Sequence, residues 1–174
     1  CAAFAQVQQR LSKIIKNNNS SINDIGCGYG KYIDYMNNNL ENMDYMGYDL
    51  SENMIDNATK IYPQNDFKHI TKLDEIRISD YSIASGIFSV KMQHNEAEWL
   101  SYILETLEQM HKKSTKGFSF NMLTKYSDKE YMRDDLYYAD PLFFFDYCKR
   151  NFSRNISLYH DYDLYEFTIL VRKD

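Results

Sequence analysis

A run of glycines and two carboxylates in the first third of the chain carry the clearest chemical signal. The run Asp24-Ile25-Gly26-Cys27-Gly28-Tyr29-Gly30 follows a short apolar segment, and Asp49 ends the next one. Glycines let a backbone turn tightly and approach a ligand closely, and the following helix start offers free N–H groups and a positive dipole end. An acid about 20 residues further on, at the end of the next strand, suits hydrogen bonds from ribose hydroxyls. The alternative is a glycine-rich turn beside an unrelated helix-capping Asp.

Hydrophobic periodicity predicts the elements that must position these residues. Apolar residues at helical spacing indicate amphipathic helices, and short apolar runs between turn signals indicate strands. Ser51 and Pro141 are favourable residues for the start of a helix. The expected helices are 3–16, 33–40, 52–61, 96–112 and 141–150, and the expected strands are 22–25, 45–50, 67–70, 80–85, 117–123, 156–160 and 165–172.

The order of these elements predicts the fold class. Strands that alternate with helices form a parallel sheet, whereas the last two strands are joined by too few residues for a crossover helix and should pair antiparallel. We therefore expect an α/β protein with a three-layer sandwich, whose seven-stranded sheet is mostly parallel with an antiparallel last strand. The length of 174 residues fits one domain, 1–174. Ligands of such sheets bind beyond the carboxyl ends of the strands.

The glycine spacing distinguishes between two nucleotide cofactors. A dinucleotide fingerprint is G-x-G-x-x-G, but this chain has G-x-G-x-G, with Lys31 in the third fingerprint position. The segment Asp24–Gly30 resembles motif I of the class I S-adenosylmethionine-dependent methyltransferases. Gly47–Ser51 resembles their second motif and Asp80–Ser85 their fourth. The resemblance covers essentially the whole chain and implies a Rossmann-like fold with S-adenosyl-L-methionine as cofactor.

The resemblance also implies a role for individual residues. Asp24 would help to hold the methionine ammonium, Asp49 would bind the ribose hydroxyls, and Leu50 would pack on adenine. Where the family usually has an acid or small polar residue after the third strand, this chain has Ile70-Thr71. The implied cofactor-binding residues are Asp24, Gly26, Cys27, Gly28, Tyr29, Asp49, Leu50, Ser85 and Gly86.

Methyl transfer to a hydroxyl group needs alignment and often a base, and histidine is the natural base near neutral pH. His94 follows the fourth strand, and His160, followed by Asp161, lies between the last two strands. These three residues are the predicted catalytic residues. The alternatives are a solvated helix-start residue for His94 and a turn residue bonded to Asp161 for His160. His69 is expected near the adenine side, and His111 on the solvated surface.

The second half of the chain resembles a group of small bacterial methyltransferases, many of them thought to act in surface-polysaccharide pathways. The segments that carry this resemblance are Phe120-Asn121, Tyr138–Pro141, His160–Tyr162 and Leu164–Thr168. The segment 126–140, rich in Tyr and Asp, is expected to be the substrate loop. The predicted substrate-binding residues are Asn121, Tyr126, Arg133 and Tyr138.

Composition and sequence motifs argue against several other classes. The net charge of −5 argues against a dedicated nucleic-acid binder, and Ser85–Phe88 lacks the Asn/Asp-Pro-Pro-aromatic motif of many enzymes that methylate base amino groups. No run approaches the ~20 apolar residues of a membrane span. The start, Cys1–Gln9, lacks a signal-peptide pattern. No Cys or His cluster indicates a metal site, so reduced thiols in a cytoplasmic protein are expected.

These observations together predict a methyltransferase that acts on a small molecule. The expected acceptor atom is an oxygen of a sugar or related polysaccharide-precursor metabolite. One alternative is a non-catalytic, cofactor-binding partner of the same fold. Another is a nicotinamide-dependent oxidoreductase, against which Lys31 argues. The sequence leaves the oligomeric state open. Its 16 tyrosines suit either a core or an aromatic pocket.

Overall fold

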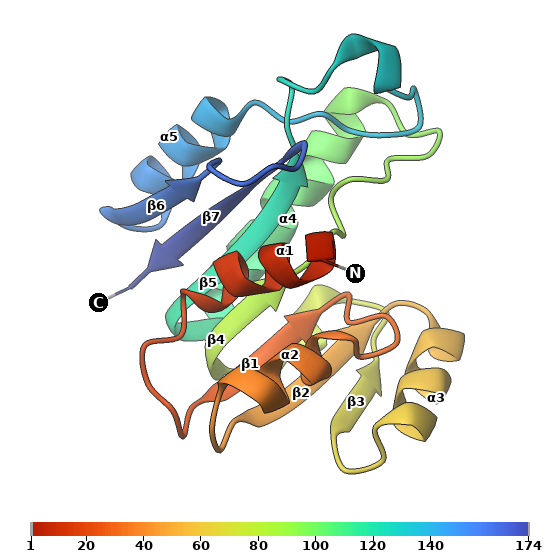
Figure 1. Cartoon of the computed structure of the whole chain (residues 1–174), viewed down its shortest axis with the longest axis vertical. Coiled ribbons are helices and arrows are strands. Elements are labelled where there is room, and N and C mark those ends of the chain that lie inside the picture. Colours follow the sequence, from red (N-terminus) through yellow and green to blue (C-terminus); the bar gives the residue numbers. More distant parts are fainter. Residues whose placement is uncertain (1, 174) are drawn as a thin grey trace.

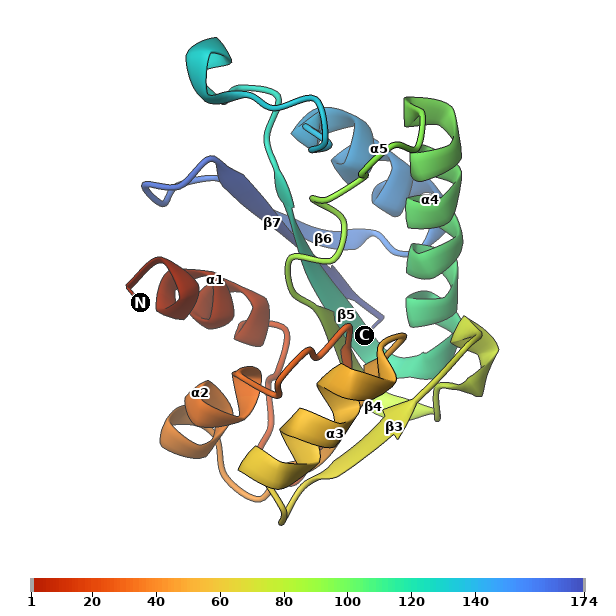
Figure 2. The same cartoon turned by 90° about the vertical axis from the view of Figure 1, so that its right-hand side faces the viewer.

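A central sheet with helices on both faces forms the architecture of the protein (Figures 1 and 2), seen in a computed structural model that describes residues 2–173. The elements in chain order are α1 (Ala2–Ser12), β1 (Ser21–Ile25), α2 (Tyr32–Asn39), β2 (Asp44–Asp49), α3 (Glu52–Ile61), β3 (Asp66–His69), the 3₁₀ turn η1 (Leu73–Glu75), β4 (Ser79–Ala84), α4 (Glu96–Lys113), β5 (Ser114–Leu123), the 3₁₀ turn η2 (Lys129–Tyr131), α5 (Pro141–Asn151), β6 (Asn155–Tyr159) and β7 (Glu166–Arg172).

The sheet has the strand order β3-β2-β1-β4-β5-β7-β6. Strands β1 to β5 pair in parallel, and β7 is inserted antiparallel between β5 and β6. Helices α1, α2 and α3 cover one face and α4 and α5 the other, which gives three layers (Figure 2). The predicted fold class is therefore confirmed, and the reversed last strand lies inside the sheet with β6 at its edge.

Two predicted element boundaries were wrong by more than one residue. The N-terminal helix was expected over 3–16 but ends at Ser12. The N–H groups of the next three residues, 13–15, bond to carbonyls only three residues back, a tighter turn than an α-helix. Ile14 in this turn is fully buried, so the apolar periodicity continues where the helix does not. Strand β5 begins at Ser114, three residues before the predicted start, directly after α4.

His111 was expected on the solvated surface, and this prediction was also wrong. Its ring is partly buried and stacks on Phe152 with 4.9 Å between ring centroids. Burial, together with the nearby Lys173 ammonium, lowers the pKa of His111. His111, in the last turn of α4, therefore packs against Phe152 rather than against water.

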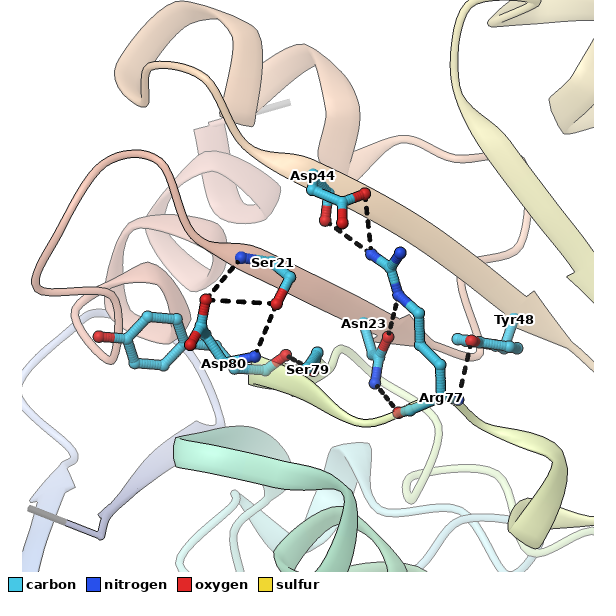
Figure 3. A network of polar contacts seen from close by, with 8 residues as sticks. Ser21, Asn23, Asp44, Tyr48, Arg77, Ser79 and Asp80 are labelled. Atoms are coloured by element: carbon cyan, nitrogen blue, oxygen red, sulfur yellow. Dashed lines mark hydrogen bonds and ion pairs between the residues drawn. The ribbon is translucent and has the colours of Figure 1, made fainter.

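Polar contacts near the amino ends of the strands, opposite the ligand-binding edge, connect neighbouring strands (Figure 3). Arg77 lies in the segment before β4, and its guanidinium donates to the carbonyl of Asp44 at 2.8 Å and pairs with that residue's carboxylate at 3.0 Å. The fully buried Asn23 donates to the carbonyl of Arg77 at 2.8 Å. The backbone N–H of Arg77 donates to the hydroxyl of Tyr48 at 3.0 Å. One segment thus connects β1, β2 and the start of β4.

A second group of contacts fixes β4 against β1. The carboxylate of Asp80 accepts from the backbone N–H of Ser21 at 2.9 Å, and the backbone N–H of Asp80 donates to the Ser21 hydroxyl at 2.8 Å (Figure 3). Lys116 of β5 pairs with the same carboxylate at 3.0 Å. Three neighbouring strands are therefore joined through one side chain.

Candidate active site

The carboxyl ends of β1, β2 and β4 lie side by side, as expected for the ligand-binding edge. Ile25 is in register with Tyr48 of β2 and with Ala84 of β4. The N–H groups of Gly26 and Cys27 both donate to the carbonyl of Tyr48, at 2.8 and 2.9 Å. The glycine loop therefore crosses over the end of β2, next to Asp49.

Two glycines of this loop have different physical roles. Gly26 has a φ of 71°, and a Cβ placed on it would lie 2.2 Å from Cγ2 of Ile87. Gly28 has a φ of 54°, and nothing lies within 4 Å of a Cβ placed there. Gly26 is therefore required for packing against the segment after β4, while Gly28 exposes its backbone to open space where a ligand can approach. Tyr29, at the tip of the loop, is exposed.

Asp49 is held in place by backbone donors. One carboxylate oxygen accepts from the N–H of Gly28 at 2.9 Å, and the other accepts from the N–H of Ser51 at 2.9 Å. A carboxylate offers about four acceptor positions, so each oxygen keeps capacity for one further donor. The fixed, half-buried carboxylate is suited to the two hydroxyls of a ribose.

A cavity of about 230 Å³, here called the cofactor cavity, lies beside Asp49. Ile70 forms a buried wall of it, and Leu50 is exposed above it. The imidazole of His69 contacts the carbonyl of Leu50 at 3.1 Å, so His69 lies against this wall. The full lining is Ile25, Gly26, Tyr48, Asp49, Leu50, Ile70, Leu73, Ile87 and Tyr102. An apolar slot next to a hydroxyl-binding acid fits the adenosine part of a nucleoside cofactor.

The side chains of Asp24 and Cys27, both predicted to bind cofactor, are buried on the core side of the glycine loop. Asp24 is buried, accepts a hydrogen bond from the hydroxyl of Tyr45 at 2.9 Å, and has its pKa raised to about 7 by that burial. Burial also raises the pKa of the Cys27 thiol well above its usual range. The Cys27 sulfur lies 2.9 Å from the position of a Cβ on Gly47. Both groups therefore support the loop from the core side.

A second cavity, of about 270 Å³, opens on the α1 side of the sheet, and we call it the β4–β5 cavity. Its polar groups are connected. Gln8 of α1 donates to the Ser85 hydroxyl at 2.9 Å, the N–H of Gly86 donates to Oδ1 of Asn121 at 2.8 Å, and Nδ2 of Asn121 donates to Glu166. The lining residues are Ala3, Phe4, Val7, Ser85, Gly86, Asn121, Leu164 and Glu166.

Gln8 and Glu166 are the members of this group that sequence reasoning missed. Gln8 is fully buried and lies on the same helical face as Phe4 and Leu11, so a polar residue in an apolar stripe was the available signal. Glu166 precedes Thr168 by two positions and therefore points to the same face of the sheet. Asn121 is in register with Thr168, which brings its side chain next to Glu166.

His94 lies outside the β4–β5 cavity. It is exposed ahead of α4, stacks on Trp99 with 6.1 Å between ring centroids, and lies 3.7 Å from a carboxylate oxygen of Glu98. It lines two surface cavities, one with Asp135 and one with Leu50 and Tyr102, which also line the cofactor cavity.

His160 and Asp161 also lie outside the lining of the β4–β5 cavity. The exposed ring of His160 lies 6.1 Å from the ring of Tyr126 and 6.2 Å from that of Phe167. Asp161 forms an ion pair with Arg10 of α1 at 3.5 Å.

The predicted substrate loop, 126–140, projects from the rest of the molecule (Figures 1 and 2). Tyr126 is exposed near its start. The guanidinium of Arg133 forms two hydrogen bonds to Asp135, at 2.9 and 2.6 Å, and its backbone N–H donates to the hydroxyl of Tyr138 at 3.0 Å. Arg133 and Tyr138 therefore make contacts within the loop, and neither is among the residues that line the β4–β5 cavity with Asn121.

Residues 2–173 hold neither a metal-binding cluster nor a membrane-spanning helix. In that range, no group of three or more His, Cys, Asp or Glu side chains could hold a metal ion. Nor does any helix in the same range have the length and apolar character needed to cross a membrane.

Comparison with known proteins defines the class that this fold and site represent. Residues 23–117 match the family described as "Methyltransferase domain". The chain belongs to this family and is a class I S-adenosylmethionine-dependent methyltransferase. A Mycobacterium tuberculosis protein, named "Putative methyltransferase Rv1506c", is 49% identical over 156 residues, which cover 88% of this chain and 93% of the relative.

Solved structures with low sequence identity share the fold. The human N-acetylserotonin methyltransferase in complex with SAM aligns with a TM-score of 0.72 at 12% identity, over 99% of this chain. This chain spans 54% of that enzyme's length. The plantazolicin methyltransferase BpumL, with a desmethylPZN analog and SAH, aligns with a TM-score of 0.69 at 16% identity and covers 99% of this chain and 85% of its own.

The protein is therefore an enzyme, and its cofactor is S-adenosyl-L-methionine. The backbone exposed at Gly28, the fixed carboxylate of Asp49 and the apolar slot at Ile70 fit this cofactor. The nicotinamide alternative is set aside, and Lys31 is an exposed residue that pairs with Asp34. When bound, S-adenosylmethionine supplies a methyl carbon on a sulfonium sulfur that a nucleophile can attack.

Proposed function

We propose that this enzyme methylates an oxygen atom of a small polar acceptor, such as a sugar or a related polysaccharide precursor. The observation that carries the proposal is the position of the two cavities around the turn that follows β4. Ile87 lines the cofactor cavity, while Ser85 and Gly86 line the β4–β5 cavity. The two cavities therefore adjoin the same turn, and an acceptor in the β4–β5 cavity would lie beside the cofactor.

The size and lining of the β4–β5 cavity support a small polar acceptor. Its volume of about 270 Å³ is near the lower end of small-molecule sites, which begin at ~300 Å³. Phe4 and Val7 offer apolar surface, and Ser85, Asn121 and Glu166 offer hydrogen-bonding groups. This mixture suits a single polar ring, with the remainder of a longer acceptor extending outside.

Within this proposal each part of the chain has a task. Asp49 binds the ribose hydroxyls, the glycine loop gives the methionine end a close path, and Leu50 and Ile70 enclose adenine. Asp24, on the core side of the glycine loop, helps to hold the methionine ammonium. Asn121 orients the acceptor, and the loop 126–140 contacts any part of it that lies outside the cavity.

Calorimetric titration with S-adenosylmethionine tests the cofactor site. Asp49→Ala removes the acceptor of two backbone hydrogen bonds and of the ribose hydroxyls, so we expect affinity to fall at least tenfold, from ~1.5–3 kcal/mol per hydrogen bond to a charged group. Asp56→Ala, a matched change at an exposed position on α3, should bind as the wild type does. Equal affinities for the wild type and Asp49→Ala would show that the cofactor site lies elsewhere.

A screen with ¹³C-methyl-labelled S-adenosylmethionine tests the acceptor atom. The protein is incubated with neutral sugars, sugar nucleotides and, for comparison, primary amines. We expect new signals in the chemical-shift range of O-methyl groups, with sugar-containing acceptors. Signals only in the N-methyl range would refute an oxygen acceptor.

A further inference from the structure

Glu166 is a half-buried carboxylic acid in the wall of the β4–β5 cavity. One oxygen accepts a hydrogen bond from Nδ2 of Asn121. The other has no hydrogen-bond partner in the part of the chain that the structure describes, and it is not enclosed by protein. The side chain therefore has one fixed oxygen and one available oxygen.

The position of Glu166 is fixed relative to the turn that adjoins the two cavities. Asn121 uses both ends of its amide, because Oδ1 accepts from the N–H of Gly86 while Nδ2 donates to Glu166. Asn121 is itself almost fully buried, so its amide cannot rotate freely. This chain of hydrogen bonds links the carboxylate to the backbone that follows β4.

We propose that Glu166 is the catalytic base, which accepts the proton of the acceptor hydroxyl during methyl transfer. The inference rests on the proposed function and assigns the residue that performs its proton transfer. The two predicted bases, His94 and His160, do not line the β4–β5 cavity, whereas Glu166 does.

The proposed step balances. The acceptor oxygen uses a lone pair to form a bond to the methyl carbon, and the bond from that carbon to sulfur breaks with its electron pair going to sulfur. The hydroxyl proton passes to the free oxygen of Glu166 and then to water. The products are a methyl ether, the neutral thioether form of the cofactor, and a proton.

The surroundings of Glu166 also define which acceptors fit. The described lining of the β4–β5 cavity contains no Lys, Arg or His, and burial raises the pKa of the Glu166 carboxyl. An anionic group next to the reacting hydroxyl would therefore face a carboxylate with no cation among the residues that line the cavity. The reacting end of the acceptor is expected to be an uncharged hydroxyl group, with any phosphate or carboxylate located outside the cavity.

Turnover of Glu166→Gln tests the proposal. Gln keeps the shape and the hydrogen bond to Asn121 but is not a base. The test uses labelled S-adenosylmethionine with methyl glucoside, a sugar nucleotide and catechol as hydroxyl probes. We expect kcat to fall by about 10²–10⁴-fold, with the calorimetric Kd for S-adenosylmethionine within about twofold of the wild type. Glu108→Gln, the same change on the exposed side of α4, is the matched control and should retain wild-type kcat.

A second variant covers the case in which Glu166→Gln does not fold. Glu166→Asp retains a carboxylate that is one methylene shorter, so it should keep measurable turnover that is slower than that of the wild type. Wild-type kcat in either variant would overturn the proposal, and so would a loss of activity in His94→Ala or His160→Ala that equals the loss in Glu166→Gln. Normal cofactor binding without turnover on any hydroxyl probe would overturn the hydroxyl acceptor and leave the cofactor site standing. Failure of the wild type to bind S-adenosylmethionine would refute the proposed function itself.

Discussion

At the scale of single residues, the two aspartates of the cofactor site lie in different environments. Asp49 is half-buried and accepts two backbone hydrogen bonds, while Asp24 is enclosed with Tyr45 as its donor. Burial disfavours the charged form of Asp24 and raises its pKa to about 7. Folded Asp24 therefore keeps its proton up to about pH 7.

This difference predicts a pH dependence of stability. Between about pH 4 and pH 7 folded Asp24 binds a proton that the unfolded chain has lost, so its contribution to the free energy of unfolding falls as pH rises and levels off above pH 7. Asp24→Asn lacks this fall, and the variant should gain stability relative to the wild type across the window, by at most about 4 kcal/mol. Urea unfolding at half-unit pH steps measures it, with Asp56→Asn as control. A constant difference across that window would contradict the prediction.

The contact between Gly26 and Ile87 gives a second prediction at this scale. Gly26→Ala should destabilise the protein by several kcal/mol, because a Cβ would lie 2.2 Å from Cγ2 of Ile87 and the residue has a positive φ. Ile87→Ala removes the obstructing methyl group, so the double variant should be more stable than the sum of the single effects predicts. Chemical denaturation of the four proteins in this cycle measures the coupling. Simple additivity would show that only the φ angle matters.

At the scale of elements, the ligand-binding edge depends on contacts at the opposite edge of the sheet. The hydroxyl of Tyr48, a residue that lines the cofactor cavity, accepts from the N–H of Arg77 in the segment before β4. The same segment is bonded to Asn23 of β1 and Asp44 of β2 (Figure 3). The same polar contacts of Arg77 therefore stabilise the register of three strands and one wall of the cofactor cavity.

Removal of this support has a measurable cost. Asn23→Ala leaves the carbonyl of Arg77 without its donor in a buried setting, and we expect a loss of about 1–3 kcal/mol in the free energy of unfolding. Asn57→Ala, which removes an exposed amide bonded within α3, should change stability by less than ~0.5 kcal/mol. Equal losses in the two variants would mean that burial of Asn23 does not matter.

At the scale of the whole molecule, the turn after β4 adjoins two cavities at the carboxyl ends of the strands, and a helix from each face of the sheet contributes to one of them. The cofactor cavity includes Tyr102 of α4, whereas the β4–β5 cavity includes Phe4 and Val7 of α1. The cofactor would contact the end of β2, the glycine loop and the turn after β4 at once. Cofactor binding therefore stabilises the arrangement of several parallel strands together.

Cofactor binding should consequently stabilise the whole fold. S-adenosylhomocysteine at about 100 times its Kd adds about 2.7 kcal/mol, which corresponds to a rise of about 5–10 °C in melting temperature for a chain of this size. Differential scanning calorimetry measures the shift, and Asp49→Ala at the same ligand concentration should show little of it. A full shift in Asp49→Ala would remove that residue from the cofactor site.

The sequence by itself determined the architecture and the cofactor loop. Most element boundaries were predicted within one residue, because apolar periodicity, caps such as Ser51 and the glycine run act locally along the chain. Asp49 could be assigned because the acid, the strand and the glycine loop follow one another at a fixed spacing. The N-terminal helix was overextended at Ile14 because a buried 3₁₀ turn carries the same apolar pattern as a helix.

Only the tertiary structure brought together the polar groups of the β4–β5 cavity. Gln8, Ser85, Asn121 and Glu166 come from α1, the end of β4, β5 and β7, and no spacing in the sequence connects them. The inserted position of β7 brings Glu166 beside Asn121, because antiparallel register is fixed by pairing between strands rather than by sequence order. The histidines were predicted from their intrinsic chemistry, whereas the positions of side chains at the cavity depend on which strands are neighbours.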